Sequence, residues 1–276
     1  MAANTTSSVK FDFHGVQASL LAPLWARAKF SREFPALFND ERAIALVDQL
    51  DYDFSAKDAA LRLEGVLAIV ARAWQLDDQI RVYISEHPKA SVINVGAGLD
   101  TAFYRVDNGY VQWYDLDLPS VIEVRRRLLP ETERTTYLSE SLFNDRWCSD
   151  IADTSNGVFL FAVGVLEWFD RSKVMQFFSL LVDHFPTAEI AFNTQSRLGK
   201  IISNWGVRRT GVKGVATKWA MKDACTMAKW DSRIEVIEQF PVFRNFPRDP
   251  EWGVRIERWM NQVDRSGWFK IAHLRV

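Results

Sequence analysis

Apolar residues recur at helical spacing through the first part of the chain. In LEGVLAIVARAW, for example, the apolar positions follow the i, i+3, i+4 rule and would share one buried helix face. In FNDERAIALVDQL, either Asn39 or Asp40 is placed to cap a helix whose first turn is acidic. His87 and Pro88 end this region, because proline cannot donate a helical hydrogen bond. The pattern predicts helices between about residues 16 and 86.

From Ser91 onward, short apolar segments alternate with helical ones. SVINV, VQWYDLD, TTYLSE, GVFLFAVGVL and AEIAFNT are predicted strands, and VIEVRRRLL and RSKVMQFFSLLVDHF are predicted helices. Apolar runs without strict alternation are typical of strands buried on both faces, so the sequence predicts an α/β fold around a mostly parallel sheet. IEVIEQF and FKIAHLRV are expected to form a hairpin-like pair, with a long turn-rich stretch containing three prolines nearby.

Composition excludes several classes of protein. The 276 residues are 48% hydrophobic and 25% charged, as in an ordinary globular protein, and disorder is excluded as the dominant state. Thirty-four Lys and Arg against 35 Asp and Glu give a net charge of −1, which does not favour a nucleic acid or an anionic membrane as partner. The two cysteines lack CxxC spacing, so neither a disulfide framework nor a metal site is expected. We expect a cytoplasmic protein without a signal peptide or membrane span.

The most informative stretch is SVINVGAGLDTAFYRVDNGYVQWYDLDLP. Gly96 and Gly98 follow a predicted strand, where a glycine turn lets a ligand approach the backbone. Asp115 and Asp117 end the next strand, where nucleotide-binding folds place a carboxylate for ribose hydroxyls. Thr101 stands where a dinucleotide fingerprint has its third Gly or Ala. The pattern therefore favours a cofactor with one nucleoside and a short charged tail; the alternative is a tight turn with two solvated aspartates.

Basic and aromatic residues interleave between residues 197 and 233. This segment contains nine Lys or Arg and three tryptophans, among them Trp205 and Trp219. One interpretation is a lid that stacks a flat or acidic small molecule on these two indoles. Single-stranded nucleic acid is a second interpretation, and a helix with a solvated basic face and buried tryptophans is a third.

Several motifs in a fixed order resemble the leucine carboxyl methyltransferase family, and the tetracenomycin-type small-molecule O-methyltransferase branch most closely. They are PLWARAKFSREFPALFND, ARAWQLDDQI, VGAGLDT, WYDLDLP, SLFNDRW and GVLEWF, within about residues 21–204. The resemblance implies a class I methyltransferase, a Rossmann-like seven-stranded sheet with an antiparallel last strand and an N-terminal helical cap. It implies S-adenosyl-L-methionine (SAM) as cofactor and S-adenosyl-L-homocysteine as product.

The resemblance also implies roles for individual residues. Arg72 would pair with the methionine carboxylate of SAM, and Gly96 and Gly98 would pass under the cofactor. Asp117 would bind the ribose, with Asp115 as its alternate. At the adenine, the implied contacts are Ser141 and Leu142, with Asp145 as a substitute. Val163 is a further implied cofactor contact, at a position where the protein-methylating branch has a glutamate. The implied substrate contacts are Arg27, Lys29, Trp168, Trp205 and Trp219.

The chain is expected to be a single methyltransferase domain. Its parts are a helical cap (1–90), a SAM-binding core (91–196), a Trp-rich basic lid (197–233) and the last two strands (234–276). The expected reaction is O-methylation of a small-molecule carboxylate or phenol, such as a polyketide-type metabolite. Methylation of a protein C-terminus and a non-methylating role are the alternatives. The oligomeric state and the pathway stay open.

Methyl transfer from a sulfonium is a displacement that depends mainly on positioning. Aromatic faces attract a positive sulfur, and Tyr104, Trp168 and Phe169 are candidates for that contact. A carboxylate acceptor is already ionised, whereas a phenol benefits from a general base. His14 is the candidate base because it precedes the helices of the cap.

Overall fold

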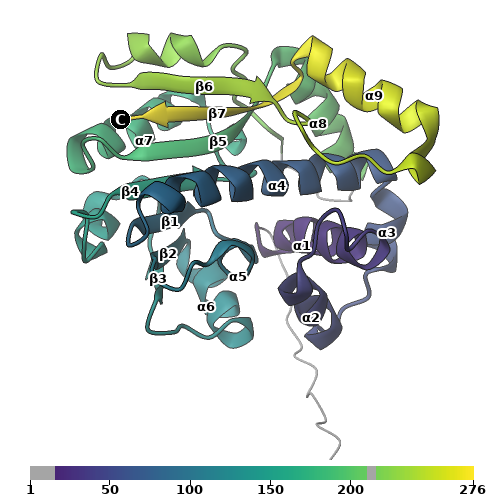
Figure 1. Ribbon diagram of the computed structural model, residues 1–276, viewed down its shortest axis with the longest axis horizontal. Helices are drawn as coiled ribbons and strands as arrows, with labels where there is room; N and C mark the ends of the chain where they lie inside the picture. Colours follow the sequence, from purple (N-terminus) through teal and green to yellow (C-terminus); the bar gives the residue numbers. More distant parts are fainter. Residues whose placement is uncertain (1–15, 210–215) are drawn as a thin grey trace, which may run out of the picture.

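One seven-stranded sheet organises the computed structural model, which describes residues 16–209 and 216–276. The strand order is β3-β2-β1-β4-β5-β7-β6. Strand β7 runs antiparallel to both of its neighbours, and the pairs among the other strands are parallel (Figure 1). The predicted α/β fold and the pairing of the last two strands are confirmed. The strands are β1 (Ser91–Val95), β2 (Gln112–Asp117), β3 (Thr135–Ser139), β4 (Val158–Ala162), β5 (Glu189–Gln195), β6 (Glu235–Pro241) and β7 (Phe269–Arg275).

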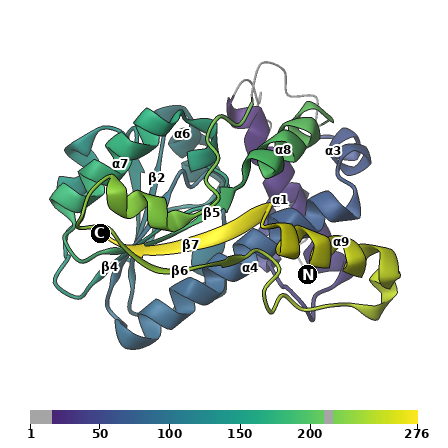
Figure 2. The same ribbon diagram turned by 90° about the horizontal axis from the view of Figure 1, so that it is seen from above.

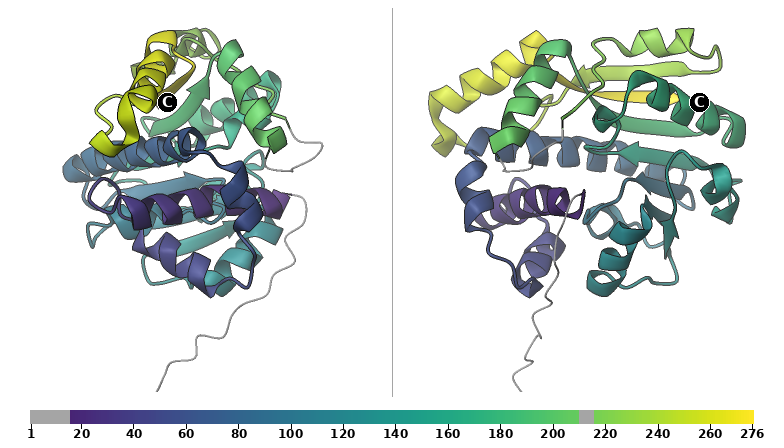
Figure 3. Two further views of the ribbon diagram at one scale, coloured as in Figure 1. Left: turned by 90° about the vertical axis from the view of Figure 1, so that its right-hand side faces the viewer. Right: turned by 180° about the vertical axis from the view of Figure 1, so that it is seen from behind.

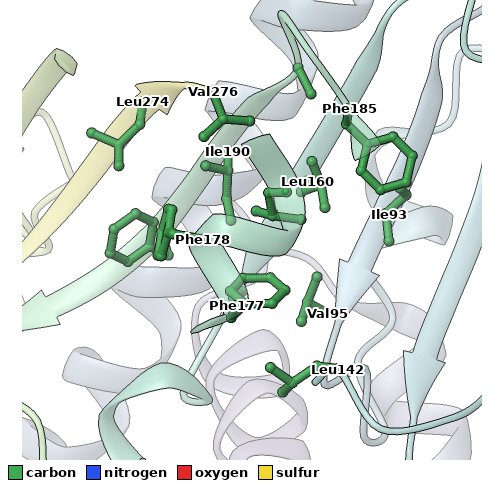
Figure 4. Close-up of a cluster of buried hydrophobic side chains, with 14 of the residues drawn as sticks. Ile93, Val95, Leu142, Leu160, Phe177, Phe178, Phe185, Ile190, Leu274 and Val276 are labelled. Atoms are coloured by element: carbon green, nitrogen blue, oxygen red, sulfur yellow. The ribbon is translucent and has the colours of Figure 1, made fainter. Parts of the chain in front are cut away.

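Helices cover both faces of this sheet. Side chains of α4 and α5 pack with Val92 on one face, whereas those of α7 pack with Ile93 and Val95 on the other (Figure 4). Every residue of β1 and β4 is buried, which explains the unbroken apolar sequence of β4 and the lack of apolar–polar alternation in β1. The α-helices are α1 (Val16–Glu33), α2 (Glu41–Gln49), α3 (Ser55–Ala60), α4 (Leu63–Glu86), α5 (Ala102–Val106), α6 (Pro119–Leu128), α7 (Arg171–His184), α8 (Arg197–Arg209) and α9 (Gly253–Ser266).

The N-terminal helices α1, α2 and α3, together with α8 and α9, gather at the end of the sheet where the parallel strands finish (Figures 1 and 2). In Figure 3, α8 (green) and α9 (yellow) lie on one side of α4, and α1 (purple) lies on the other. Asp40 caps α2 by accepting a hydrogen bond from the amide of Ala43 at 2.9 Å, as one of the two predicted caps. The five helices α1, α2, α3, α8 and α9 therefore stand over the carboxyl ends of the parallel strands.

A buried ion-pair network joins the N-terminal helices to α5, the short helix that follows the loop after β1. Arg105 of α5 bridges Asp40, which begins α2, and Asp77 of α4, with nitrogen–oxygen distances of 2.7 Å to each. Thr101 donates its hydroxyl proton to Asp40 at 2.7 Å. Neighbouring Arg105 and Arg27 hold the pKa of Asp40 below its usual range, although burial alone would raise it. The loop after β1 is therefore held against the helices that precede it.

The segment between β6 and β7 differs from the expectation of a turn-rich stretch. It contains α9, whose Ile256, Met260 and Val263 recur at helical spacing and are buried. Three prolines before the helix and Gly253 at its start are typical of turns, and for that reason this segment was predicted to be turn-rich. Among the described residues, no helix is long and apolar enough to span a membrane.

Candidate functional site

The carboxyl ends of the parallel strands form one edge of the sheet, called the carboxyl edge below. The glycine turn after β1 lies at its centre. Gly96 and Gly98 have φ of +68° and +49°, a conformation that favours glycine. The amides of Gly96 and Ala97 both donate to the carbonyl of Leu116, at 2.7 and 3.1 Å. A Cβ atom at Gly96 would lie only 2.5 Å from Cγ2 of Val165 in the loop after β4. The turn is thus closely fitted between β2 and that loop.

Asp117 stands beside this turn, at the end of β2. Its Oδ2 accepts a hydrogen bond from the amide of Gly98 at 2.8 Å, and its Oδ1 accepts one from Leu118 at 2.7 Å. Burial raises the pKa of Asp117, and the two backbone hydrogen bonds oppose this shift. The carboxylate keeps lone pairs that can accept hydroxyl protons from a ligand lying over the turn.

Asp115, two residues earlier on β2, is buried in an ion pair. It is 1% exposed, and its Oδ2 lies 2.7 Å from the guanidinium of Arg125. Asn94 and Trp113 donate to its other oxygen. Arg125 also donates to the carbonyl of Gly98 at 3.1 Å. Asp115 thus pairs with an arginine that braces the glycine turn from below, and its part as the alternate ribose contact stays a prediction.

Ser141 and Leu142 follow β3, one strand further along the edge. The amide of Glu140 donates to the carbonyl of Asp117 at 3.1 Å, so this loop lies directly beside the ribose candidate. Ser141 is partly buried and accepts a hydrogen bond from Phe143, while Leu142 packs into the core (Figure 4). Asp145 is exposed at the start of a short 3-10 helix (Asp145–Asp150).

Arg72 of α4 reaches the same edge from the opposite side of the turn. Its Nη1 lies 3.4 Å from Oε1 of Glu167, in the 3-10 helix Leu166–Trp168 that follows β4. Burial lowers the pKa of Arg72, and the attraction of Glu167 opposes that shift. Asn193 of β5 also donates to Oε1 of Glu167, at 3.1 Å. Val163, in the same loop, packs against apolar residues of the core.

Glu167 lies beside Arg72 and was not predicted from the sequence as a candidate site residue. It is 6% exposed, and within the described residues its Oε2 has no hydrogen-bond partner. The one available signal was an acidic residue inside the otherwise apolar GVLEWF at the end of a strand.

Arg27 and Lys29 are both engaged with protein groups. Arg27 is 5% exposed, donates to Asp40 at 3.0 Å and donates to the carbonyl of Leu99 at 2.8 Å. Lys29 pairs with Asp58 on α3. Arg27 thus supports the glycine turn from within the network, and its assignment as a substrate contact stays a prediction. Lys29 as a substrate contact stays a prediction.

The three tryptophans predicted to meet the substrate lie in different environments. Trp219 is 6% exposed and stacks on Phe192 in the core, and its assignment as a stacking surface for substrate stays a prediction. Trp205, on α8, is 60% exposed. Trp168 is partly buried and donates its indole proton to the carbonyl of Gly164 at 2.7 Å, beside Arg72.

The other two aromatic residues predicted to contact the positive sulfur also lie in different environments. Tyr104 is 41% exposed and lies under the guanidinium of Arg42, whereas Phe169 packs edge-on against Phe143. His14 lies outside the described residues, so its role as a base stays a prediction. Among the described residues, no group of three or more His, Cys, Asp or Glu could hold a metal ion.

This fold, a seven-stranded sheet with a glycine turn after β1 and an acid after β2, is that of class I methyltransferases. The family model for leucine carboxyl methyltransferase matches residues 21–155. The tetracenomycin polyketide synthesis O-methyltransferase TcmP of Streptomyces glaucescens is 30% identical over 180 residues, which are 65% of this chain and 66% of that enzyme. The chain belongs to the leucine carboxyl methyltransferase family and is a SAM-dependent methyltransferase.

Further comparisons agree. The S-adenosyl-L-methionine-dependent methyltransferase dpfgK of Gibberella zeae is 23% identical over 97% of this chain and 98% of its own length. A methyltransferase candidate from Thermobifida fusca superposes with a TM-score of 0.60 at 14% identity, covering 99% of this chain and 96% of that one. A duf574 family protein from Streptomyces avermitilis gives 0.61 at 14% identity, covering 91% and 96%. These two structures support the fold alone.

The residues at the carboxyl edge fit the cofactor of this family. SAM combines a ribose with hydroxyl donors and an amino-acid end that carries one positive and one negative charge. The glycine turn offers backbone at close approach, Asp117 offers acceptors, and the Arg72–Glu167 pair offers both charges.

Proposed function

We propose that this enzyme transfers the methyl group of SAM to an oxygen atom of a small-molecule carboxylate or phenol, of the polyketide type. The observation that carries the proposal is the 30% identity to TcmP over about two thirds of both chains, together with the family match, which includes the whole glycine turn and the Asp117 strand end. The apolar surroundings of Val163 are consistent with a small-molecule acceptor, because the protein-methylating branch has a glutamate there.

The residues of this chain would hold the cofactor at three points. Arg72 pairs with the carboxylate of its amino-acid end, since a guanidinium matches a carboxylate in charge and shape. Asp117 accepts the ribose hydroxyl protons, and the backbone at Gly96 and Gly98 passes beneath. The adenine lies toward Ser141 and Leu142, next to Asp117 along the same edge. SAM supplies an electrophilic methyl group on a sulfonium, so the protein has to position the acceptor oxygen in line with it.

The acceptor side would be formed by α8 and the helical cap. Leu198, Ile201 and Trp205 are 50%, 64% and 60% exposed and recur at helical spacing on α8. An exposed apolar stripe of this kind suits a flat, mostly apolar molecule. A carboxylate acceptor would react without a base, whereas a phenol would require one.

The test is methyl transfer from SAM to a panel of aromatic acids, phenols and phenol-free neutral analogues, followed by mass spectrometry. The proposal predicts a gain of one methylene on acids or phenols, accompanied by S-adenosyl-L-homocysteine. Binding of SAM without methylation of any acceptor, but with methylation of a peptide C-terminus, would overturn it.

A further inference from the structure

Glu167 is a buried carboxylate with one oxygen left unsatisfied. Its Oε1 accepts a hydrogen bond from Asn193 and lies 3.4 Å from Nη1 of Arg72. Its Oε2 is buried and has no hydrogen-bond partner in the part of the chain that the structure describes. An unsatisfied buried carboxylate oxygen costs free energy, because no donor compensates for its desolvation. Such an atom in a native site calls for a partner that the protein chain does not supply.

The surrounding backbone fixes the residue in place. The carbonyl of Glu167 accepts hydrogen bonds from the amides of Lys218 and Trp219, at 2.7 and 3.2 Å. Asn193, which holds Oε1, also accepts a hydrogen bond from the amide of Gly164 at 2.6 Å. The backbone of Glu167 is therefore held by the segment at Lys218 and Trp219, and its carboxylate by Asn193 and Arg72.

Arg72 and the loop that contains Gly164 lie beside this carboxylate. A Cβ atom placed on Gly164, which has φ of +69°, would lie 3.9 Å from Nη1 of Arg72, which is ordinary van der Waals contact. The contact between Arg72 and Glu167 is a single one at 3.4 Å, longer than a charge-assisted hydrogen bond of optimal geometry. The guanidinium and the carboxylate thus present opposite charges side by side with unused hydrogen-bonding capacity on the carboxylate.

We propose that Glu167 binds the α-ammonium group of the cofactor, so that Arg72 and Glu167 together receive its zwitterionic amino-acid end. The inference rests on the proposed function in one respect, the pairing of Arg72 with the cofactor carboxylate. An α-ammonium group has three donors, which satisfy Oε2 and leave Asn193 in place on Oε1. The positive and negative charges of the ligand then match those of the pair, and no buried charge stays unpaired.

The test compares two ligands on two proteins by calorimetric titration. The ligands are S-adenosyl-L-homocysteine and its analogue with hydrogen in place of the α-amino group. For the Glu167→Gln variant, we expect the affinity for S-adenosyl-L-homocysteine to fall about tenfold or more (about 1.4 kcal/mol). The affinity for the deaminated analogue should stay within about twofold of wild type, because that ligand has no ammonium group to lose.

Asp170→Asn is the matched control, since this acidic residue lies three positions further on and is exposed. It should leave both affinities unchanged. Should Glu167→Gln fail to fold, Glu167→Asp keeps the charge but withdraws it by one methylene, and the same selective loss is expected.

Two results would overturn the inference. Unchanged binding of S-adenosyl-L-homocysteine would show that Glu167 does not meet the ligand. An equal loss for both ligands would show that Glu167 acts only by holding Arg72. Either result leaves the proposed function standing, whereas wild-type protein that binds neither ligand would remove the proposed function itself.

Discussion

The carboxylate of Asp117 and the amide of Gly98 are joined by a hydrogen bond of 2.8 Å that closes the end of β2 onto the turn after β1. Asp117 thus braces the turn, and its remaining lone pairs can accept hydrogen bonds from a ligand that lies over the turn. Asp115, two residues earlier on the same strand, faces the interior and pairs with Arg125. Two aspartates that look alike in the sequence therefore have separable roles.

This separation predicts opposite outcomes for two alanine variants. Asp115→Ala leaves Arg125 as an unpaired buried charge and should lower the free energy of unfolding by about 3–5 kcal/mol. Asp117→Ala should cost less stability, since burial already penalises that charge, but should weaken S-adenosyl-L-homocysteine binding about tenfold or more. Urea unfolding and calorimetry measure the two effects. A large loss of affinity in a stable Asp115→Ala protein would reverse the assignment.

Gly96→Ala should destabilise the protein through two separate effects. The left-handed backbone costs about 1–2 kcal/mol for a non-glycine residue, and the new Cβ atom would meet Val165 at 2.5 Å. Gly109→Ala is the matched control, because Gly109 has φ of +84° and a Cβ atom there would have no neighbour within 4 Å among the described residues. Gly109→Ala should show the backbone cost alone and keep wild-type cofactor affinity. Equal unfolding free energies for the two variants would contradict the steric account.

Replacing two tryptophans should separate packing from acceptor binding. Trp219→Ala removes a buried ring stacked on Phe192 and should cost about 3–5 kcal/mol. Trp205→Ala, at an exposed position, should change stability by less than about 1 kcal/mol and should raise KM for the acceptor with little change for SAM. Steady-state kinetics with both substrates measures this. An unchanged acceptor KM would remove α8 from the acceptor site.

Stability in acid should depend on Glu189. Burial would raise its pKa, but hydrogen bonds from His273 and Arg275 outweigh burial and lower it. A lowered pKa in the folded state means that the stabilisation is present above the unfolded pKa and is lost as the pH falls through the folded value. Glu189→Gln should therefore cost about 1.5 kcal/mol at neutral pH and progressively less below about pH 4. A cost that does not vary with pH would contradict this assignment.

The sequence predicted those features that depend on local pattern. The strand before Gly96 and the acid at the end of the next strand follow from spacing, so the turn and the position of Asp117 could be predicted. The Asp115–Arg125 pair could not, because hydrophobicity and spacing do not tell which strand-end carboxylate turns inward. The burial of Trp219 was equally hidden, since a tryptophan among basic residues fits a lid and a core alike.

The position of Glu167 beside Arg72 could not be predicted from the sequence either. In the sequence it is one acidic residue in an apolar loop, with its partners Arg72 and Asn193 distant along the chain. Only the arrangement of α4, β5 and the loop after β4 reveals a buried carboxylate whose second oxygen is unsatisfied among the described residues.

The most direct test of the account is calorimetric titration of the purified protein with S-adenosyl-L-homocysteine, repeated on Arg72→Ala. We expect binding of about micromolar affinity, weakened about tenfold or more by the substitution, which corresponds to about 1.4 kcal/mol. Absence of binding by well-folded wild-type protein, or equal affinity in both proteins, would contradict the assignment of the carboxyl edge as the cofactor site.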